Sequence, residues 1–506
     1  MKPDAFLANA LLPDGRKAHI GIADGIIAEI RPADRPVDNS ASVMDVGGAL
    51  VLPGFVEGHI HLDKTVYGLK WRPHGGDGTR MSRIENDKKA WGELPPVAER
   101  AGNLVDLCIR QGTTHIRSHA DVDLEGGLSK VEALIAVRQR FRGQVGLTIV
   151  AFPQSGVMRC PGVLALLDEA MAMGADLVGG MDPSEIDRDP KGQLDGIFAI
   201  AERRGVGLDI HLHEPGELGI SNLQQICERT AALGLGGTVT ISHGFCLGMV
   251  AERKADEMAD LMARSGVALV THGAASAAVP PLLKLRRAGV NVFAGNDDVR
   301  DTWSPYGNAD MLQRAMLIGW RSDYRSDEDL LAAFDMTTAA GARAHGVATY
   351  GLVAGAPADL CAVAASCVPE AIAAQPPRQW VMRPAASSPT TVCGWRRRKR
   401  WAPRKPSIAA TSLHEAVRAP ASAELSRMAS GQLPQRRIDR CSCNLSPPSS
   451  PWSPCRFSRC RFPRRPSRRR SPSPAIPKMR SSTCSMPASS AIGAGQCGSP
   501  PAPASL

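Results

Sequence analysis

The chain has 506 residues, enough for one large barrel with a smaller domain, and its formal net charge is +10. That charge comes from residues 384–506, which hold 22 Lys and Arg against 3 Asp and Glu. Residues 1–383 therefore carry a net charge of −9, and nothing in them indicates a nucleic-acid-binding surface. Neither a run of eighteen apolar residues nor a basic-then-apolar leader occurs, which predicts a cytoplasmic protein without a membrane span.

Residues 1–50 have the pattern of a small β domain. Short apolar runs lie at 5–8, 18–22 and 26–30, and Asp14-Gly15 and Asp24-Gly25 separate them. Because Asp-Gly is typical of tight hairpin turns, we expect antiparallel hairpins here.

From residue 51 onward the pattern alternates strand and helix. Candidate strands lie at about 50–56, 113–118, 146–152, 176–181, 206–212, 238–243, 267–271 and 290–295. Helical patterns at 163–173 and 196–203 fill two of the gaps between them. This spacing predicts an α/β fold with a closed (β/α)8 TIM barrel over residues 51–345, rather than an open doubly wound sheet.

Residues 346–383 return to a β-like pattern. Apolar runs at 346–353 and 355–363, with a further strand near 379–383, can pair with the amino-terminal hairpins. We therefore expect a small β-sandwich domain formed from both ends of the catalytic region.

Residues 384–506 form a basic tail rich in Pro, Arg and Ser. It holds 19 of the chain's 39 prolines and has no sustained apolar period, so we expect it to be disordered. One hypothesis is a basic arm that binds nucleic acid; the other is an out-of-frame translation of a GC-rich gene. The second is favoured, because the tail begins where a terminal strand is due and its seven cysteines lack metal-ligand spacing.

Acid and imidazole side chains follow several candidate strands. They are His59 and His61 after the first strand, His211, His213 and Glu214 after the fifth, His243 after the sixth, and Asp297 and Asp298 after the eighth. The carboxyl ends of barrel strands meet at one rim, so these residues are expected to converge there. Three histidines and a carboxylate predict one divalent metal, although strand alternation leaves either His211 or His213 as the third imidazole.

Several of these residues also have ordinary structural explanations. Glu214 beside a metal could take a proton from water and pass it to a ring nitrogen or a leaving amine, or it could simply cap the next helix. His243 could ligate the metal or polarise the substrate. Trp303 could stack on a flat ring or be a buried aromatic residue of the rim.

Five motifs in order resemble the amidohydrolase superfamily and, within it, the cytosine deaminase group. They are residues 51–63, 150–156, 209–214, 242–243 and 297–303, and the resemblance extends from residue 1 to about 383. It implies a mononuclear site of His59, His61, His211 and Asp297 that holds iron(II) or zinc. It also implies roles for other residues: Gln154 binds the pyrimidine edge, Glu214 shuttles the proton, His243 stabilises the attacked centre, Asp297 or His243 accepts a proton, and Asp298 and Trp303 line the pocket.

Two departures from that group concern the substrate. Cytosine deaminases of the family carry Asp where His213 stands, and they have a longer basic segment where this chain has residues 271–281. In addition, the segment His61-Leu-Asp-Lys64 is similar to relatives that remove alkylamines from hydroxylated triazines.

The sequence therefore predicts a metal-dependent aminohydrolase that releases ammonia from cytosine or a related amino-pyrimidine. The alternative is an N-alkylaminohydrolase or cyclic amidase acting on a triazine-like ring. The expected partner is a small heterocyclic substrate, and the sequence is compatible with a homo-oligomer.

Overall fold

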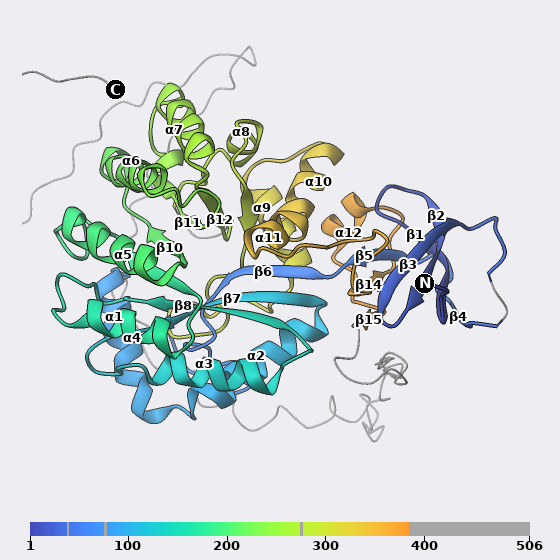
Figure 1. Cartoon of the computed structure of the whole chain (residues 1–506), viewed down its shortest axis with the longest axis horizontal. Coiled ribbons are helices and arrows are strands. Elements are labelled where there is room, and N and C mark those ends of the chain that lie inside the picture. Colours follow the sequence, from blue (N-terminus) through green and yellow to red (C-terminus); the bar gives the residue numbers. More distant parts are fainter. Residues whose placement is uncertain (38–39, 75–77, 274–276, 384–506) are drawn as a thin grey trace, which may run out of the picture. The chain divides into compact units, whose positions relative to one another are not determined.

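The computed structural model describes residues 1–37, 40–74, 78–273 and 277–383. Its largest sheet has eight strands that lie in chain order, each parallel to the next (Figure 1). They are β6 (Phe55–Ile60), β7 (Thr113–Asp121), β8 (Gly146–Phe152), β9 (Leu177–Met181), β10 (Gly207–Leu212), β11 (Val239–His243), β12 (Ala268–Thr271) and β13 (Val292–Ala294). The first and last strands meet where the Asp297 N–H donates to the His59 carbonyl over 2.7 Å. The predicted α/β barrel is confirmed.

Two glycines allow the seam between β6 and β13 to close. A Cβ on Gly295 would lie 2.4 Å from the backbone nitrogen of His59, and a Cβ on Gly58 would lie 2.4 Å from the Phe293 ring. Neither distance leaves room for a side chain, so this close approach of the two strands requires glycine at both positions.

Helices surround the barrel, and those from α1 to α8 connect its strands (Figure 1). They are α1 (Arg80–Ala90), η1 (Trp91–Glu93), α2 (Val97–Arg110), α3 (Ser129–Arg140), α4 (Val163–Met173), α5 (Pro190–Arg204), α6 (Gly216–Ala232), η2 (Phe245–Gly248), α7 (Glu252–Ser265), α8 (Leu282–Arg287), α9 (Met311–Arg321), α10 (Asp327–Met336), α11 (Ala339–Ala344) and α12 (Val368–Ala374). The sequence marks the ends of α5 clearly: the Asp189 carboxylate caps the first turn, and Gly205 ends the helix with a φ of 64°. The apolar helix faces pack on the strands in one continuous core.

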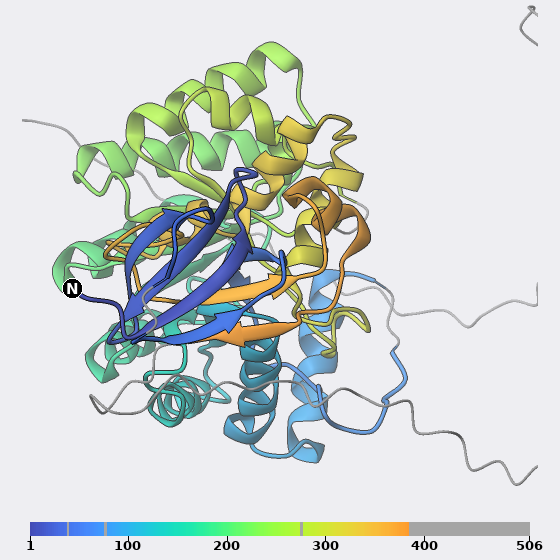
Figure 2. The same ribbon diagram turned by 90° about the vertical axis from the view of Figure 1, so that its right-hand side faces the viewer.

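A second sheet of seven strands is built from both ends of the described chain. Its strands are β1 (Ala5–Leu11), β2 (Lys17–Ala23), β3 (Ile26–Pro32), β4 (Ser42–Asp45), β5 (Leu50–Pro53), β14 (Leu360–Val363) and β15 (Trp380–Met382). Their order is β15-β14-β5-β1-β2-β3, and β4 pairs with β1. Figure 2 shows β14 and β15 in orange beside the blue amino-terminal strands. The predicted pairing of the two chain ends is therefore present.

Two strand predictions are wrong in detail. The segment 50–56 was expected to be one barrel strand, but β5 pairs with β14 in the small sheet and the barrel begins with β6 at Phe55. Gly54 lies between them, where a Cβ would approach the Thr114 methyl to 2.1 Å. The predicted run at 346–353 contains turns and bends instead of a strand, and Gly346 and Gly351 have positive φ there.

The tail at 384–506 lies outside the described residues. The structure therefore tests neither of the two hypotheses about this tail. Among the described residues, no helix is both long enough and apolar enough to cross a membrane.

Candidate active site

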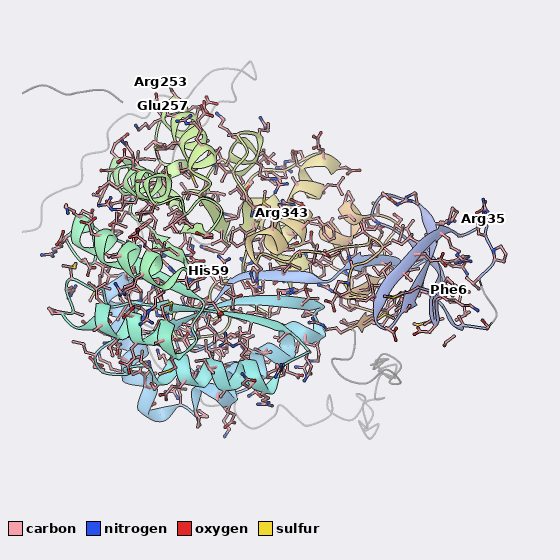
Figure 3. All side chains as sticks on the ribbon, viewed as in Figure 1. Phe6, Arg35, His59, Arg253, Glu257 and Arg343 are labelled. Carbon is pink, nitrogen blue, oxygen red and sulfur yellow. The ribbon has the colours of Figure 1, made fainter. Side chains whose placement is uncertain are left out.

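The carboxyl ends of the barrel strands bring the predicted metal ligands together. His59 lies near the end of β6, His61 follows that strand, His211 lies in β10 and Asp297 follows β13; Figure 3 labels His59. The ring centroid of His59 is 5.3 Å from that of His61 and 4.7 Å from that of His211. Asp297 Oδ1 lies 3.2 Å from His59 Nε2 and 3.4 Å from His61 Nε2. Ligand atoms of His59 and His211 lie within 4.8 Å of that of His61 in one candidate cation group and within 4.8 Å of that of Asp297 in another.

Two further imidazoles belong to this cluster. His243, which the sequence indicated, shares a possible cation site with His59, His211 and Asp297, in which all ligand atoms lie within 4.8 Å of one another. His119, which the sequence prediction omits, forms a second such group with His59, His61 and His211. The predicted strand ended at residue 118, so His119 directly follows it, and the rule that selected the other histidines applies to His119 without change.

The chemistry of the cluster suits a divalent cation. Burial lowers the pKa of His61, His211 and His243 well below its usual value, so these imidazoles are neutral and offer lone pairs. Burial would raise the pKa of Asp297, but the facing imidazoles outweigh it and hold that pKa well below its usual value. Within the described residues, Nε2 of His59 and both ring nitrogens of His211 and His243 are buried without a hydrogen-bond partner. Neutral imidazoles with one carboxylate are a donor set that zinc and iron(II) accept.

The backbone at two cluster residues is strained. His243 and Asp297 have φ angles of 75° and 62°, in the left-handed region that non-glycine residues seldom adopt. Next to Asp297, the Asn296 N–H donates to Glu57 Oε1 over 2.7 Å, and Arg314 Nη2 donates to the Asn296 carbonyl over 3.1 Å. These buried hydrogen bonds hold the segment that presents Asp297.

A buried lysine joins the imidazole cluster to the predicted substrate-binding residues. Lys64 Nζ lies 3.3 Å from His61 Nδ1 and donates a hydrogen bond to the side-chain oxygen of Gln154. The same ammonium group lies 5.4 Å from the ring centroid of Phe152 and 5.1 Å from that of Trp303. Gln154 and Trp303 therefore meet at Lys64, which the sequence noted as part of a motif but did not include among the site residues.

Asp121 completes this wall of the site. It accepts hydrogen bonds from Gln154 Nε2 over 3.2 Å and from Lys130 Nζ over 2.9 Å. Burial would raise the pKa of Asp121, but the ammonium groups of Lys130 and Lys64 outweigh it and lower that pKa to about 2. The Gln154 amide thus lies between a cation at its oxygen and an anion at its nitrogen, and this fixes its orientation.

Asp298 also reaches the cluster. Its ligand atom forms a group with those of His61 and Asp297 in which all separations are within 4.8 Å. Desolvation and the neighbouring carboxyl groups of Asp301 and Asp297 raise the pKa of Asp298 well above its usual value. The pKa values of these two adjacent aspartates are therefore shifted in opposite directions, because the imidazoles face one and the carboxylates crowd the other.

Glu214 is completely buried, and donors surround its carboxylate. Its Oε1 accepts hydrogen bonds from the backbone N–H groups of Ser184 and Glu185 over 2.6 and 2.7 Å, and Oε2 accepts one from the Asn222 side chain. Burial raises the pKa of Glu214 in spite of these donors. The carboxylate is positioned firmly, by the segment before α5 and by α6.

The pair formed by His213 and Asp182 lies against the cluster. His213 Nδ1 is 2.8 Å from Asp182 Oδ2, and its ring stacks on that of His243 with centroids 4.4 Å apart. The His272 ring lies 5.2 Å from that of His243. Because Asp182 engages Nδ1 of His213 while His211 joins the imidazole cluster, the geometry favours His211 over His213 as the metal ligand.

Comparisons with known proteins agree with this architecture. The model of the amidohydrolase family matches residues 42–382. N-isopropylammelide isopropyl amidohydrolase of Pseudomonas sp. (strain ADP) is 31% identical over 367 residues, which are 71% of this chain and 90% of that protein. Among solved structures, N-isopropylammelide isopropylaminohydrolase from Burkholderia multivorans ATCC 17616 is 44% identical with a TM-score of 0.72, covering 75% of this chain and 97% of that one.

A second solved structure is that of 5-methylcytosine deaminase from Klebsiella pneumoniae with 5-fluorocytosine. It is 28% identical with a TM-score of 0.67, and the match covers 76% of this chain and 96% of that one. The family model and these relatives confirm the resemblance found in the sequence, and the chain belongs to the amidohydrolase family, whose enzymes bind a divalent metal.

Proposed function

We propose that this protein hydrolyses the exocyclic C–N bond of an oxo-substituted nitrogen heterocycle, with an N-alkylamino triazine-like ring as the leading substrate class. Support comes from the 44% identity to N-isopropylammelide isopropylaminohydrolase, against 28% to 5-methylcytosine deaminase. Release of ammonia from cytosine or a related amino-pyrimidine is the second candidate. The similarities thus favour the alternative that the sequence placed second.

The observation that carries the proposal is the group of His59, His211, His243 and Asp297: their ligand atoms lie within 4.8 Å of one another, and the three imidazoles have buried nitrogens without a hydrogen-bond partner. His59, His61, His211 and Asp297 would hold one divalent ion, either iron(II) or zinc. When bound, such an ion supplies Lewis acidity and lowers the pKa of water at the site. The other residues of the site then bind the ring and carry protons.

The wall around Lys64 supports an oxo-substituted ring as the substrate. The buried ammonium can donate a charge-assisted hydrogen bond to a ring oxygen, and Gln154 can pair with the polar edge of the ring. Trp303 offers a flat face beside the same ammonium, and Asp298 lies beside His61 and Asp297. These four side chains would therefore orient the ring.

Glu214 and His243 would carry out the proton transfers. Water adds its oxygen to the ring carbon, and Glu214 accepts a proton from water and passes it to the neighbouring ring nitrogen. His243, or Asp297, accepts the second proton of the water, while the His243 ring also stabilises charge on the attacked centre. The exocyclic C–N bond then breaks, and the leaving nitrogen takes the second water proton from His243 or Asp297 to depart as an alkylamine or as ammonia.

The test compares amine and ammonia release by metal-replete protein. N-isopropylammelide, cytosine and 5-methylcytosine are assayed in parallel, and isopropylamine and ammonia are quantified separately. We expect kcat/KM to be at least ~10-fold higher for N-isopropylammelide, about 1.4 kcal/mol of discrimination. Faster ammonia release from a pyrimidine would favour the second candidate. Hydrolysis of none of the three rings would refute both.

A further inference from the structure

One buried carboxylate beside the cluster has no part in the proposed reaction. Asp209 lies in β10 two residues before His211, so it occupies the barrel layer nearer the amino ends of the strands. It is completely buried, and its Oδ2 accepts a hydrogen bond from Arg117 Nη1 over 3.0 Å. Arg117 also donates to Thr240 Oγ1 over 3.0 Å and to the Ala344 carbonyl over 2.6 Å. The Arg117 guanidinium, held by these two further hydrogen bonds, therefore fixes the position of the Asp209 carboxylate.

The other oxygen of Asp209 reaches the cluster through a serine. Ser242 Oγ donates its only proton to Asp209 Oδ1 over 2.5 Å, and the same Oγ lies 2.9 Å from His59 Nδ1. Because the hydroxyl proton is already used, Oγ accepts from His59, which must carry its proton on Nδ1. The lone pair of His59 is then on Nε2, the atom that faces Asp297 Oδ1 at 3.2 Å.

The same carboxylate also faces a second imidazole. His119 Nε2 lies 3.4 Å from Asp209 Oδ1, and the rings of His119 and His59 have centroids 4.2 Å apart. A single anion thus acts on two neighbouring rings of the cluster.

We propose that Asp209 is a positioning residue for the metal site: through Ser242 it fixes the proton of His59 on Nδ1 and directs the Nε2 lone pair at the ion. The inference rests on the metal site of the proposed function, and it concerns how tightly the chain holds the ion, whatever the substrate. Such hydrogen bonds to metal-ligating imidazoles typically change metal affinity by about 10–100-fold.

The test measures metal binding in Ser242→Ala and Asp209→Asn, with Thr230→Val as the control. Thr230 lies in α6, its buried hydroxyl group donates to the Ile226 carbonyl over 2.8 Å, and valine preserves the shape of threonine. Protein stripped of metal is titrated with Zn²⁺ against a chromophoric chelator, and with Co²⁺ as a spectroscopic probe. We expect Ser242→Ala to bind zinc ~10–100-fold more weakly and to shift the cobalt absorption bands. Thr230→Val should do neither.

A wild-type zinc affinity and cobalt spectrum in folded Ser242→Ala would overturn the proposal. Asp209→Asn is expected to weaken zinc binding at least as much. This substitution leaves the Arg117 charge unpaired and can impair folding. If the Asp209→Asn protein does not fold, Ser242→Ala alone decides the question. No substrate enters these measurements, so a failure to hydrolyse any ring refutes the proposed function without touching this inference. If the wild-type chain binds neither ion, the metal site and the role of Asp209 are refuted together.

Discussion

The two ends of strand β7 carry the same residue type in different surroundings. His115, near the amino end, has Nδ1 3.1 Å from the Thr114 hydroxyl, and its ring lies 6.1 Å from that of His345. His119, near the carboxyl end, lies among the imidazoles that face Asp297. Burial lowers the pKa of both His115 and His119 to about 4. A lowered histidine pKa therefore reports burial; convergence with other ligands and a carboxylate is what distinguishes the carboxyl end as a candidate for chemistry.

The sharpest test of this difference removes one histidine from each end. We expect His59→Ala to lose its metal and to lower kcat/KM by roughly 10³-fold or more, because one of the four proposed ligands is gone. The control, His115→Ala, should keep the metal content of the wild type. Metal analysis and kinetics on the same preparations check both expectations. Full metal content in His59→Ala would contradict its role as a ligand.

Glu214→Gln should have the next largest effect. Glutamine keeps the shape of the side chain but cannot carry the proton, so we expect kcat to fall by about 10²–10⁴-fold while the metal stays bound. Glu185→Gln is a suitable control, because its side chain pairs with Arg80 and only its backbone N–H holds Glu214. Steady-state kinetics with metal analysis measures the effect. Unchanged turnover in Glu214→Gln would refute the proton-transfer role.

Lys64→Met should affect substrate binding more than metal binding. Methionine removes the ammonium group but keeps an apolar stem between Phe152 and Trp303, so we expect KM to rise by about 10–100-fold, the loss of one charge-assisted hydrogen bond. Lys88→Met in α1 is the control, since that lysine pairs with Asp123 and Glu125. An unchanged KM, or loss of the metal, would show that Lys64 does not act on the substrate in this way.

The smallest effect is expected at the amino end of the barrel. His115 has a pKa of about 4 when folded and about 6.5 when unfolded, so the unfolded chain takes up a proton first as the pH falls. The stability associated with neutral His115 is complete above pH 6.5 and is lost between pH 6.5 and 4. His115→Gln should make this decline shallower by roughly 1–3 kcal/mol, measured by denaturant unfolding, with kcat unchanged at neutral pH. An equally steep decline, or a lowered kcat, would argue against a purely structural role.

Strand spacing predicted the barrel well because each β/α unit repeats one length. The prediction failed at 50–56 because an apolar run does not reveal which sheet it joins. Gly54 divides this run into two strands. The Thr114 side chain, distant in sequence, leaves no room for a Cβ at Gly54. The prediction failed at 346–353 because apolar residues alternate there around glycines with positive φ.

His59, His61, His211, His243 and Asp297 could be found from the sequence because each lies at or just after the carboxyl end of a strand, whereas His119 was missed. Lys64 could not, since its burial depends on Phe152 and Trp303, which come from distant segments. Asp209 reads as an ordinary strand residue until Ser242 and Arg117 are seen on either side of it. Contacts between distant parts of the chain decide the roles of Lys64 and Asp209, and the spacing of residues along one segment does not reveal such contacts.

The seam between β6 and β13 gives the ion a mechanical consequence. His59 and His61 lie in or just after β6, and Asp297 follows β13. An ion bound by all three side chains would therefore link the two strands that close the barrel. Metal removal should then speed hydrogen exchange at the amides of His61 and Asp297, while the β7–β8 amides exchange as before. The cation would then stabilise the closed barrel as well as take part in the reaction, and the rate of deuterium uptake at these two amides would report how often the seam opens.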